Sequence, residues 1–158
     1  MKELAKKVKA DSFLLMASSN EIRNKCLKNI IENLNKDKEH ILAENRRDIE
    51  NARLENIPDS ILSRLLFDAH KMDTVTAGIK DLIKMPDPIG KITLKRELDK
   101  GLVLTRTTTP IGVIGVIFEA RPDALVQIAS LCIKSGNAAI LKGGSEAKLT
   151  NRALFESI

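Results

Sequence analysis

Residues 109–147 read TPIGVIGVIFEARPDALVQIASLCIKSGNAAILKGGSEA, and this stretch decides the fold. Its apolar residues run almost without interruption over 111–118, as in a strand that is covered on both faces. Apolar residues recur at helical spacing after Pro122, and a second buried strand is predicted at 138–141. A strand, a helix and a strand in this order predict a parallel pair, and parallel sheets bind ligands at the carboxyl ends of their strands.

The rest of the chain divides at a proline- and glycine-rich break near residues 86–90. Helical periodicity predicts a helical segment over 1–90, and alternating residues predict a β-hairpin over 91–109. The start of a dinucleotide-binding domain is then predicted at 110–158. The predicted fold class is therefore α/β: N-terminal helices, a β-hairpin and the first half of a doubly wound parallel sheet. We expect this sheet to be incomplete, because the sequence stops one short helix after the second strand.

Two details of the N-terminal part and the hairpin also follow from periodicity. In the second predicted helix, apolar residues recur every four positions at Ile22, Cys26, Ile30 and Leu34, and Leu27 and Ile31 widen this stripe, which is predicted to be buried. The hairpin alternates polar and apolar residues, so one of its faces is expected to be wet or to meet another subunit. We therefore treat it as a candidate oligomerisation element.

The composition excludes several classes of protein. The 158 residues are 43% apolar, enough for a core, and no apolar run is long enough to span a bilayer, so we expect a cytoplasmic protein. The net charge of +5 does not indicate nucleic-acid binding, because basic and acidic residues are interleaved and Trp and Tyr are absent. His40 and His70 lack metal-ligand spacing. Cys26 and Cys132 lie on apolar faces of predicted helices, which argues against a disulfide.

The second buried strand ends in Lys142-Gly143-Gly144-Ser145-Glu146, which carries the main chemical signal. Lys142 is expected at the carboxyl edge of the sheet, and the two glycines allow the backbone to approach a bulky ligand closely. Ser145 is predicted to cap the next helix, whose N-terminus favours anions, and Glu146 can accept hydrogen bonds from ribose hydroxyls. The combination suits a nucleotide sugar and phosphate, although it is neither a P-loop nor GxGxxG. The alternative is a plain strand-to-helix turn with an exposed lysine.

Four motifs stand close together in this part of the chain: P-I-G-V-I-G-V-I, E-x-R-P, L-C-I-K-S-G-N-A and L-K-G-G-S-E-A. Together with N-R-x-D-I-E-N-A in the helical part, they resemble the gamma-glutamyl phosphate reductase family of the aldehyde dehydrogenase superfamily, over essentially the whole chain. The resemblance implies reduction of L-glutamate 5-phosphate to L-glutamate 5-semialdehyde with NADPH and release of phosphate, in proline biosynthesis. It further implies that a cysteine thiolate attacks the acyl phosphate and forms a thioester, which hydride then reduces.

The resemblance also assigns roles to residues of this chain. The cofactor-binding residues that it implies are Lys142, Gly143, Gly144, Ser145 and Glu146 on the adenosine side, and Ile117, Phe118 and Glu119 near the nicotinamide. Arg121 either binds a substrate phosphate or carboxylate or forms a structural salt bridge. Ala120 stands where the wider superfamily has an oxyanion-stabilising Asn, so that donor is absent or comes from elsewhere.

No catalytic residue is predicted within this chain. The nucleophilic cysteine of the family is expected beyond Ile158, and both Cys132 and Cys26 are interpreted as core residues. The chain alone is therefore expected to be inactive, and the complete enzyme to be a homo-oligomer that acts on a small molecule. Two other interpretations stay open: an enzyme of the superfamily with another acyl donor or aldehyde, and an inactive binding or assembly fragment.

Overall fold

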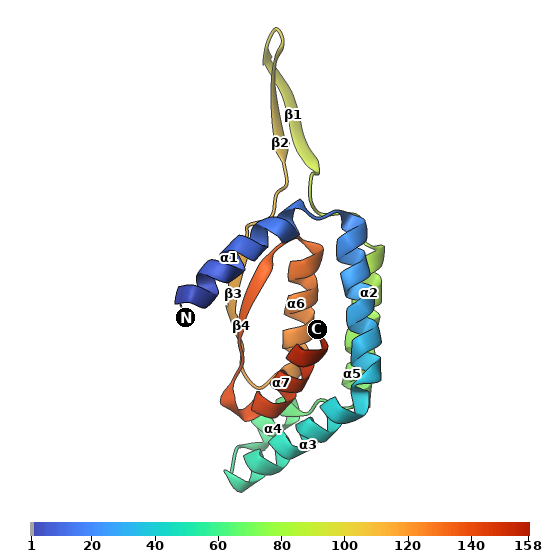
Figure 1. Ribbon diagram of the computed structural model, residues 1–158, viewed down its shortest axis with the longest axis vertical. Coiled ribbons are helices and arrows are strands. Elements are labelled where there is room, and N and C mark those ends of the chain that lie inside the picture. The colour runs from blue at the N-terminus through green and yellow to red at the C-terminus, as the bar shows by residue number, and fades with distance from the viewer. Residues whose placement is uncertain (1) are drawn as a thin grey trace.

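A computed structural model describes residues 2–158 and has the mixed α/β architecture predicted from the sequence (Figure 1). It contains two separate two-stranded sheets, the hairpin β1–β2 and the parallel pair β3–β4. None of the helices within the described residues is long and apolar enough to cross a membrane. The elements follow the chain in the order α1 (Lys2–Ala17), α2 (Asn20–Lys36), α3 (Lys38–Leu54), α4 (Asp59–Leu65), α5 (Ala69–Lys84), β1 (Ile92–Asp99), β2 (Leu102–Thr107), β3 (Val113–Ile117), α6 (Pro122–Lys134), β4 (Ala138–Lys142), the 3-10 helix η1 (Ser145–Ala147) and α7 (Lys148–Ser157).

The unit β3–α6–β4 confirms the strand–helix–strand order predicted from residues 109–147. The two strands pair in parallel along their whole lengths. Pro122 occupies the first turn of α6, where its missing N–H leaves no hydrogen bond unmade. The helix ends before Gly136, whose φ of +70° suits glycine, and a Cβ at this position would lie 2.7 Å from the Ile89 side chain. Local sequence chemistry thus sets both ends of the connecting helix.

The parallel strands are less buried than their apolar sequences predict. Ile117, at the end of β3, is 81% exposed, and Ile111, just before β3, is 79% exposed. Strand β3 pairs only with β4, and no other strand of residues 2–158 joins this sheet. The prediction of a strand covered on both faces is therefore wrong for this chain, because two strands and the helices that contact them leave apolar side chains open to solvent.

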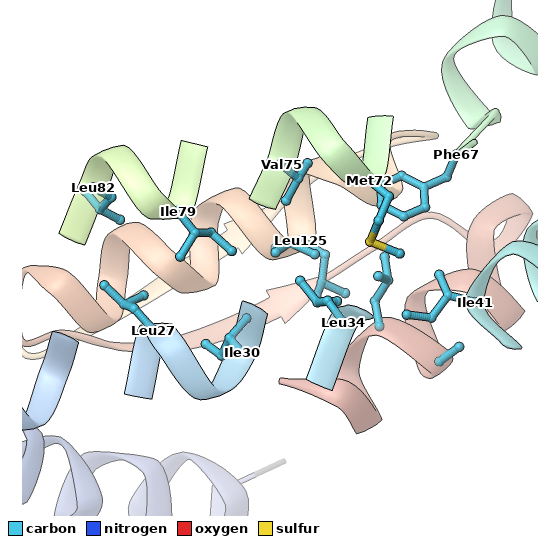
Figure 2. Close-up of a cluster of buried hydrophobic side chains, with 13 residues drawn as sticks. Leu27, Ile30, Leu34, Ile41, Phe67, Met72, Val75, Ile79, Leu82 and Leu125 are labelled. Carbon is cyan, nitrogen blue, oxygen red and sulfur yellow. The ribbon is translucent and has the colours of Figure 1, made fainter. Parts of the chain in front are cut away.

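One hydrophobic core joins the helices to the parallel pair, and Figure 2 shows its side chains pointing toward one another between α2, α5 and α6. Leu27 and Leu34 of α2, Met72 of α5 and Leu125 of α6 are at most 5% exposed. Met72, Val75, Ile79 and Leu82 lie on the buried face of α5. This core contains side chains from before and after residues 86–90. The division into a helical segment and a dinucleotide-binding domain near these residues therefore stays a prediction.

The buried face of α2 differs from the predicted stripe. Ile22 and Cys26 are exposed, while Arg23 is only 1% exposed. Nη2 of Arg23 donates to both carboxylate oxygens of Asp87, in the loop after α5, at 2.7 and 2.8 Å, and Nη1 donates to the carbonyl of Ser18. The interpretation of Cys26 as a core residue is therefore wrong. A charged side chain with a partner for its charge takes the buried face, which apolar periodicity alone does not predict.

The β1–β2 hairpin projects from one end of the molecule (Figure 1). Every residue from 90 to 107 is exposed, including the large apolar side chains of Ile92 and Leu102, so both faces are exposed and not one. At its base, the N–H of Gly90 donates to the carbonyl of Thr108 at 2.9 Å, and the N–H of Thr108 donates to the carbonyl of Lys91 at 3.0 Å. The alternation of polar and apolar residues in the hairpin therefore does not mark a face that other residues of 2–158 cover.

Candidate functional site

A cavity of about 940 Å³ opens where β3 and β4 end. The loops after these strands line one side of it, and α3, α4 and their connection line the other. Arg121 does not line this cavity; it precedes α6, is exposed, and pairs with no carboxylate of the described chain. The structure instead brings together all eight residues that the resemblance implies for cofactor binding: Ile117, Phe118, Glu119, Lys142, Gly143, Gly144, Ser145 and Glu146.

Glu146 links the two strand-exit loops. Its Oε1 accepts a hydrogen bond of 2.7 Å from the backbone N–H of Ala120. Ala120 is 5% exposed and has a φ of +35°, a conformation that costs a non-glycine residue on the order of 1–3 kcal/mol. A charge-assisted hydrogen bond to this N–H offsets part of that cost. Glu146 therefore fixes the loop after β3, and one of its two oxygens is already engaged before any ligand binds.

The two glycines after Lys142 leave space that other side chains of the chain fill. A Cβ on Gly144 would lie 2.1 Å from Oε1 of Glu146. A Cβ on Gly143 would lie 2.3 Å from the amide nitrogen of Asn151 and 3.3 Å from the ring of Phe118. Neither glycine has a positive φ. The absence of a side chain at Gly144 thus lets the carboxylate of Glu146 reach across to the neighbouring loop, a reason that the sequence did not indicate.

Asp48 of α3 caps α7, and Ser145 does not. One carboxylate oxygen of Asp48 accepts from the N–H of Leu149 at 3.2 Å. The other accepts from the N–H of Thr150 at 2.8 Å and from its hydroxyl at 2.7 Å. The side chain of Ser145 makes no cap hydrogen bond, because a 3-10 turn places it one turn before α7. The prediction of Ser145 as the cap is wrong, and the helix N-terminus that was expected to attract an anion already holds a carboxylate of the chain.

Lys142 is exposed at the end of β4, and its ammonium lies 3.5 Å from the carbonyl of Gly143. No carboxylate of the described residues forms an ion pair with it. The side of the cavity opposite the strand ends adds residues that sequence reasoning missed, among them Arg47, Asn51, Glu55 and Arg64. Arg47 and Asn51 lie within the motif N-R-x-D-I-E-N-A, and this was the only signal for them, since nothing in the sequence pairs these helices with the strand ends.

Neither cysteine belongs to this site. Cys132 is buried in α6, as predicted, and burial raises the pKa of its thiol above the usual value. Cys26 is exposed on α2, and neither residue lines the cavity. Both histidines, His40 and His70, are exposed. Among residues 2–158, no group of three or more His, Cys, Asp or Glu side chains is placed to hold a metal ion. The cavity therefore offers cations, carboxylates and apolar surface for binding a ligand, and no thiol to attack one.

The sequence of this chain is similar to those of known proteins. No family model matches the chain. It is 51% identical over 154 residues to the gamma-glutamyl phosphate reductase of Pelotomaculum thermopropionicum, covering 98% of this chain and 36% of that protein. The corresponding values for the protein of the same name from Acetivibrio thermocellus are 50% identity, 99% and 36%. The chain corresponds to the N-terminal part of gamma-glutamyl phosphate reductases. It spans about a third of the length of these relatives.

Solved structures agree with this assignment. The crystal structure of gamma-glutamyl phosphate reductase from Thermotoga maritima superposes with a TM-score of 0.93 at 34% identity, covering 98% of this chain and 37% of that one. The Saccharomyces cerevisiae reductase gives 0.94 at 41% identity, with 98% and 40% covered. A Bacillus subtilis protein named as an aldehyde dehydrogenase gives 0.73 at 14% identity, which shows a shared fold alone. The chain therefore has the aldehyde-dehydrogenase type of fold in the part that it covers.

Proposed function

We propose that this chain supplies the adenosine side of an NADPH site in a cytoplasmic gamma-glutamyl phosphate reductase. The reaction is the reduction of L-glutamate 5-phosphate to L-glutamate 5-semialdehyde with release of phosphate, a step of proline biosynthesis. The cavity at the ends of β3 and β4 carries this proposal. Its volume of about 940 Å³ is at the upper end of the range for small-molecule pockets, roughly 300–1,000 Å³. It joins an exposed ammonium, a diglycine turn and a carboxylate, which suit a phosphorylated ribose.

Different residues of the cavity bind different parts of the cofactor in this proposal. Lys142 attracts a phosphate on the ribose, because its ammonium is exposed and forms no ion pair with a carboxylate of residues 2–158. Glu146 accepts from ribose hydroxyls through the oxygen that Ala120 does not use. Ile117 offers an exposed apolar side chain toward the nicotinamide side. The bound cofactor supplies the hydride, and the residues named here hold and orient it. Neither Cys26 nor Cys132 acts as the nucleophile in this proposal, because neither lines the cavity.

The test is a fluorescence titration of the chain with NADPH and with NADH. We expect Lys142→Ala to weaken NADPH binding about 10-fold or more, in line with the loss of a charged hydrogen bond of roughly 1.5–3 kcal/mol, and NADH binding less. Lys142→Arg should keep most of the NADPH affinity. If Lys142→Ala changes neither the NADPH nor the NADH affinity, Lys142 is an ordinary surface lysine with no role in binding. Semialdehyde formation by the chain alone would show that the nucleophile was misplaced.

We also propose that the β1–β2 hairpin carries self-association. Its support is an exposed hairpin on which Ile92, Leu98 and Leu102 are each more than half exposed, an unusual amount of apolar surface for a single copy in water. This surface equally suits the interpretation of the chain as an assembly module. Light scattering on the chain and on a variant with Leu98 and Leu102 changed to Ser separates the cases. A concentration-dependent dimer that only the unchanged chain forms is expected, and identical masses would count against the hairpin.

A further inference from the structure

The side of the cavity that α3 and α4 form has a cation of its own. Ile57, Pro58 and Ile61 line the cavity next to Arg64, one turn further along α4. This wall lies far in sequence from the strand-exit motif, and nothing in the motif assigns it a role. An apolar patch beside a guanidinium is the combination that holds a purine ring and a phosphate together, because the ring excludes water and the cation neutralises charge.

Three of the other charged groups that line the cavity already have partners within the chain, while Glu55, Glu119 and Lys148 form no ion pair with the described residues. Asp48 accepts from the amides that begin α7, and Glu146 accepts from Ala120. Arg47 donates to both oxygens of Glu44 at 2.8 and 3.0 Å. Arg64 forms no ion pair with any carboxylate of residues 2–158. Its guanidinium can therefore turn to a ligand without breaking a contact.

The backbone that carries Arg64 is held rigidly. The buried amide of Asn45 donates to the carbonyl of Leu65 at 2.9 Å and accepts from the N–H of Phe67 at 2.8 Å. The ammonium of Lys71 donates to the carbonyl of Arg64 itself at 3.3 Å. Leu65 and Phe67, on either side of the exposed Leu66, are both buried in the core. A cation on a fixed backbone costs less entropy to position on a ligand than one on a mobile loop.

We propose that Arg64 and Lys142 share one phosphate, the 2′-phosphate of NADPH, from the two sides of the cavity. The inference rests on the proposed function and adds a second residue, beside Lys142, that selects NADPH over NADH. A phosphate monoester carries about −1.5 to −2 charges at pH 7, so a single ammonium leaves it undercompensated. A guanidinium can donate two parallel hydrogen bonds to it, which an ammonium cannot do. Ile57, Pro58 and Ile61 then lie beside the adenine ring.

The experiment compares two ligands that differ by this phosphate, adenosine 2′,5′-bisphosphate and adenosine 5′-monophosphate, in calorimetric titrations of the chain. The unchanged chain should prefer the bisphosphate. Arg64→Gln should weaken bisphosphate binding about 10-fold or more and monophosphate binding less than about 2-fold, because only one charged contact is lost. Arg64→Lys should restore part of the preference. Arg53→Gln is the matched control: it removes the same charge from an exposed position of α3 that does not line the cavity, and should leave the preference unchanged.

Two results would overturn the inference, and only the second would also overturn the proposed cofactor site. If the chain binds both ligands and Arg64→Gln keeps the preference, or weakens both ligands equally, Arg64 does not hold the phosphate and the proposed cofactor site stands. If the unchanged chain binds neither ligand, the proposed site fails together with the inference. Circular dichroism and urea unfolding of each variant separate a lost contact from a lost fold, and Arg64→Lys supplies a second folded variant.

Discussion

The carboxylate of Asp48 offers the sharpest test of how the cavity is built. It is 3% exposed and bridges α3 to the first turn of α7, where it accepts two backbone N–H groups and one hydroxyl. Asn45 extends the bridge by donating to the hydroxyl of Thr150 at 3.1 Å. We predict that Asp48→Ala destabilises the chain strongly, and that the helix after the Lys142–Glu146 corner loses its anchor.

The expected magnitude follows from the groups left without partners. Loss of a helix cap costs about 1 kcal/mol, and a hydrogen bond to a charged group contributes roughly 1.5–3 kcal/mol. Because the three contacts share one carboxylate, their losses are not additive, and we expect about 3–5 kcal/mol in total. With a urea m-value of about 2 kcal/mol/M, the unfolding midpoint should fall by about 1.5–2.5 M.

Asp68 provides the matched control for this measurement. It also caps a helix with a carboxylate, but it is exposed and accepts a single N–H, from Lys71 at 2.9 Å. Asp68→Ala should cost about 1 kcal/mol, or about 0.5 M in the urea midpoint. Amide hydrogen exchange at Leu149 and Thr150 should accelerate in Asp48→Ala and not in Asp68→Ala. Equal midpoint shifts for the two variants would refute the view that the buried bridge anchors α7.

Two further predictions concern burial elsewhere in the chain. Asp87→Asn leaves the guanidinium of Arg23 buried without its counter-charge and should lower the free energy of unfolding in urea by about 3–5 kcal/mol. Asp81→Asn breaks the exposed pair with Lys84 and should lower it by at most about 1 kcal/mol. Similar losses for the two variants would contradict the role of the buried pair. In a reaction with a chromogenic disulfide at pH 8, Cys26 should react fast and Cys132 only on unfolding, because burial raises the pKa of its thiol and shields it. A single fast phase that includes both thiols in the folded chain would exclude the buried placement of Cys132.

What the sequence could predict was local. The parallel unit followed from apolar runs, Pro122 and Gly136, each of which acts within a few residues of itself. Lys142 and the residues after it could be placed at the carboxyl edge of the sheet because a buried parallel strand ends there, whereas Ile117, Phe118 and Glu119 followed only from the family resemblance. The hairpin boundaries followed in the same way from alternation and a turn.

What the sequence could not predict depends on partners far along the chain. Asp48 and Thr150 are separated by 102 positions, and Arg23 and Asp87 by 64. Residue periodicity does not predict such pairs. The sequence therefore predicts Ser145 as the cap of the helix that Asp48 caps in the structure. For the same reason the sequence does not predict the burial of Arg23, and it wrongly places Cys26 in the core. The sequence does not predict the α3–α4 side of the cavity, because α3 is held beside the loop after β4 by tertiary contacts with η1 and α7.

The hydrogen bonds that join Thr108 to Gly90 and Lys91 determine how the hairpin can be altered. They bring the polypeptide back to the point at which it left the body of the molecule. The protruding segment between them can therefore be shortened, lengthened or fused to a foreign peptide without pulling on α5 or β3. A protease that cuts at its tip leaves the cavity at the ends of β3 and β4 where it was, so the proposed self-association and the proposed ligand binding can be tested one at a time.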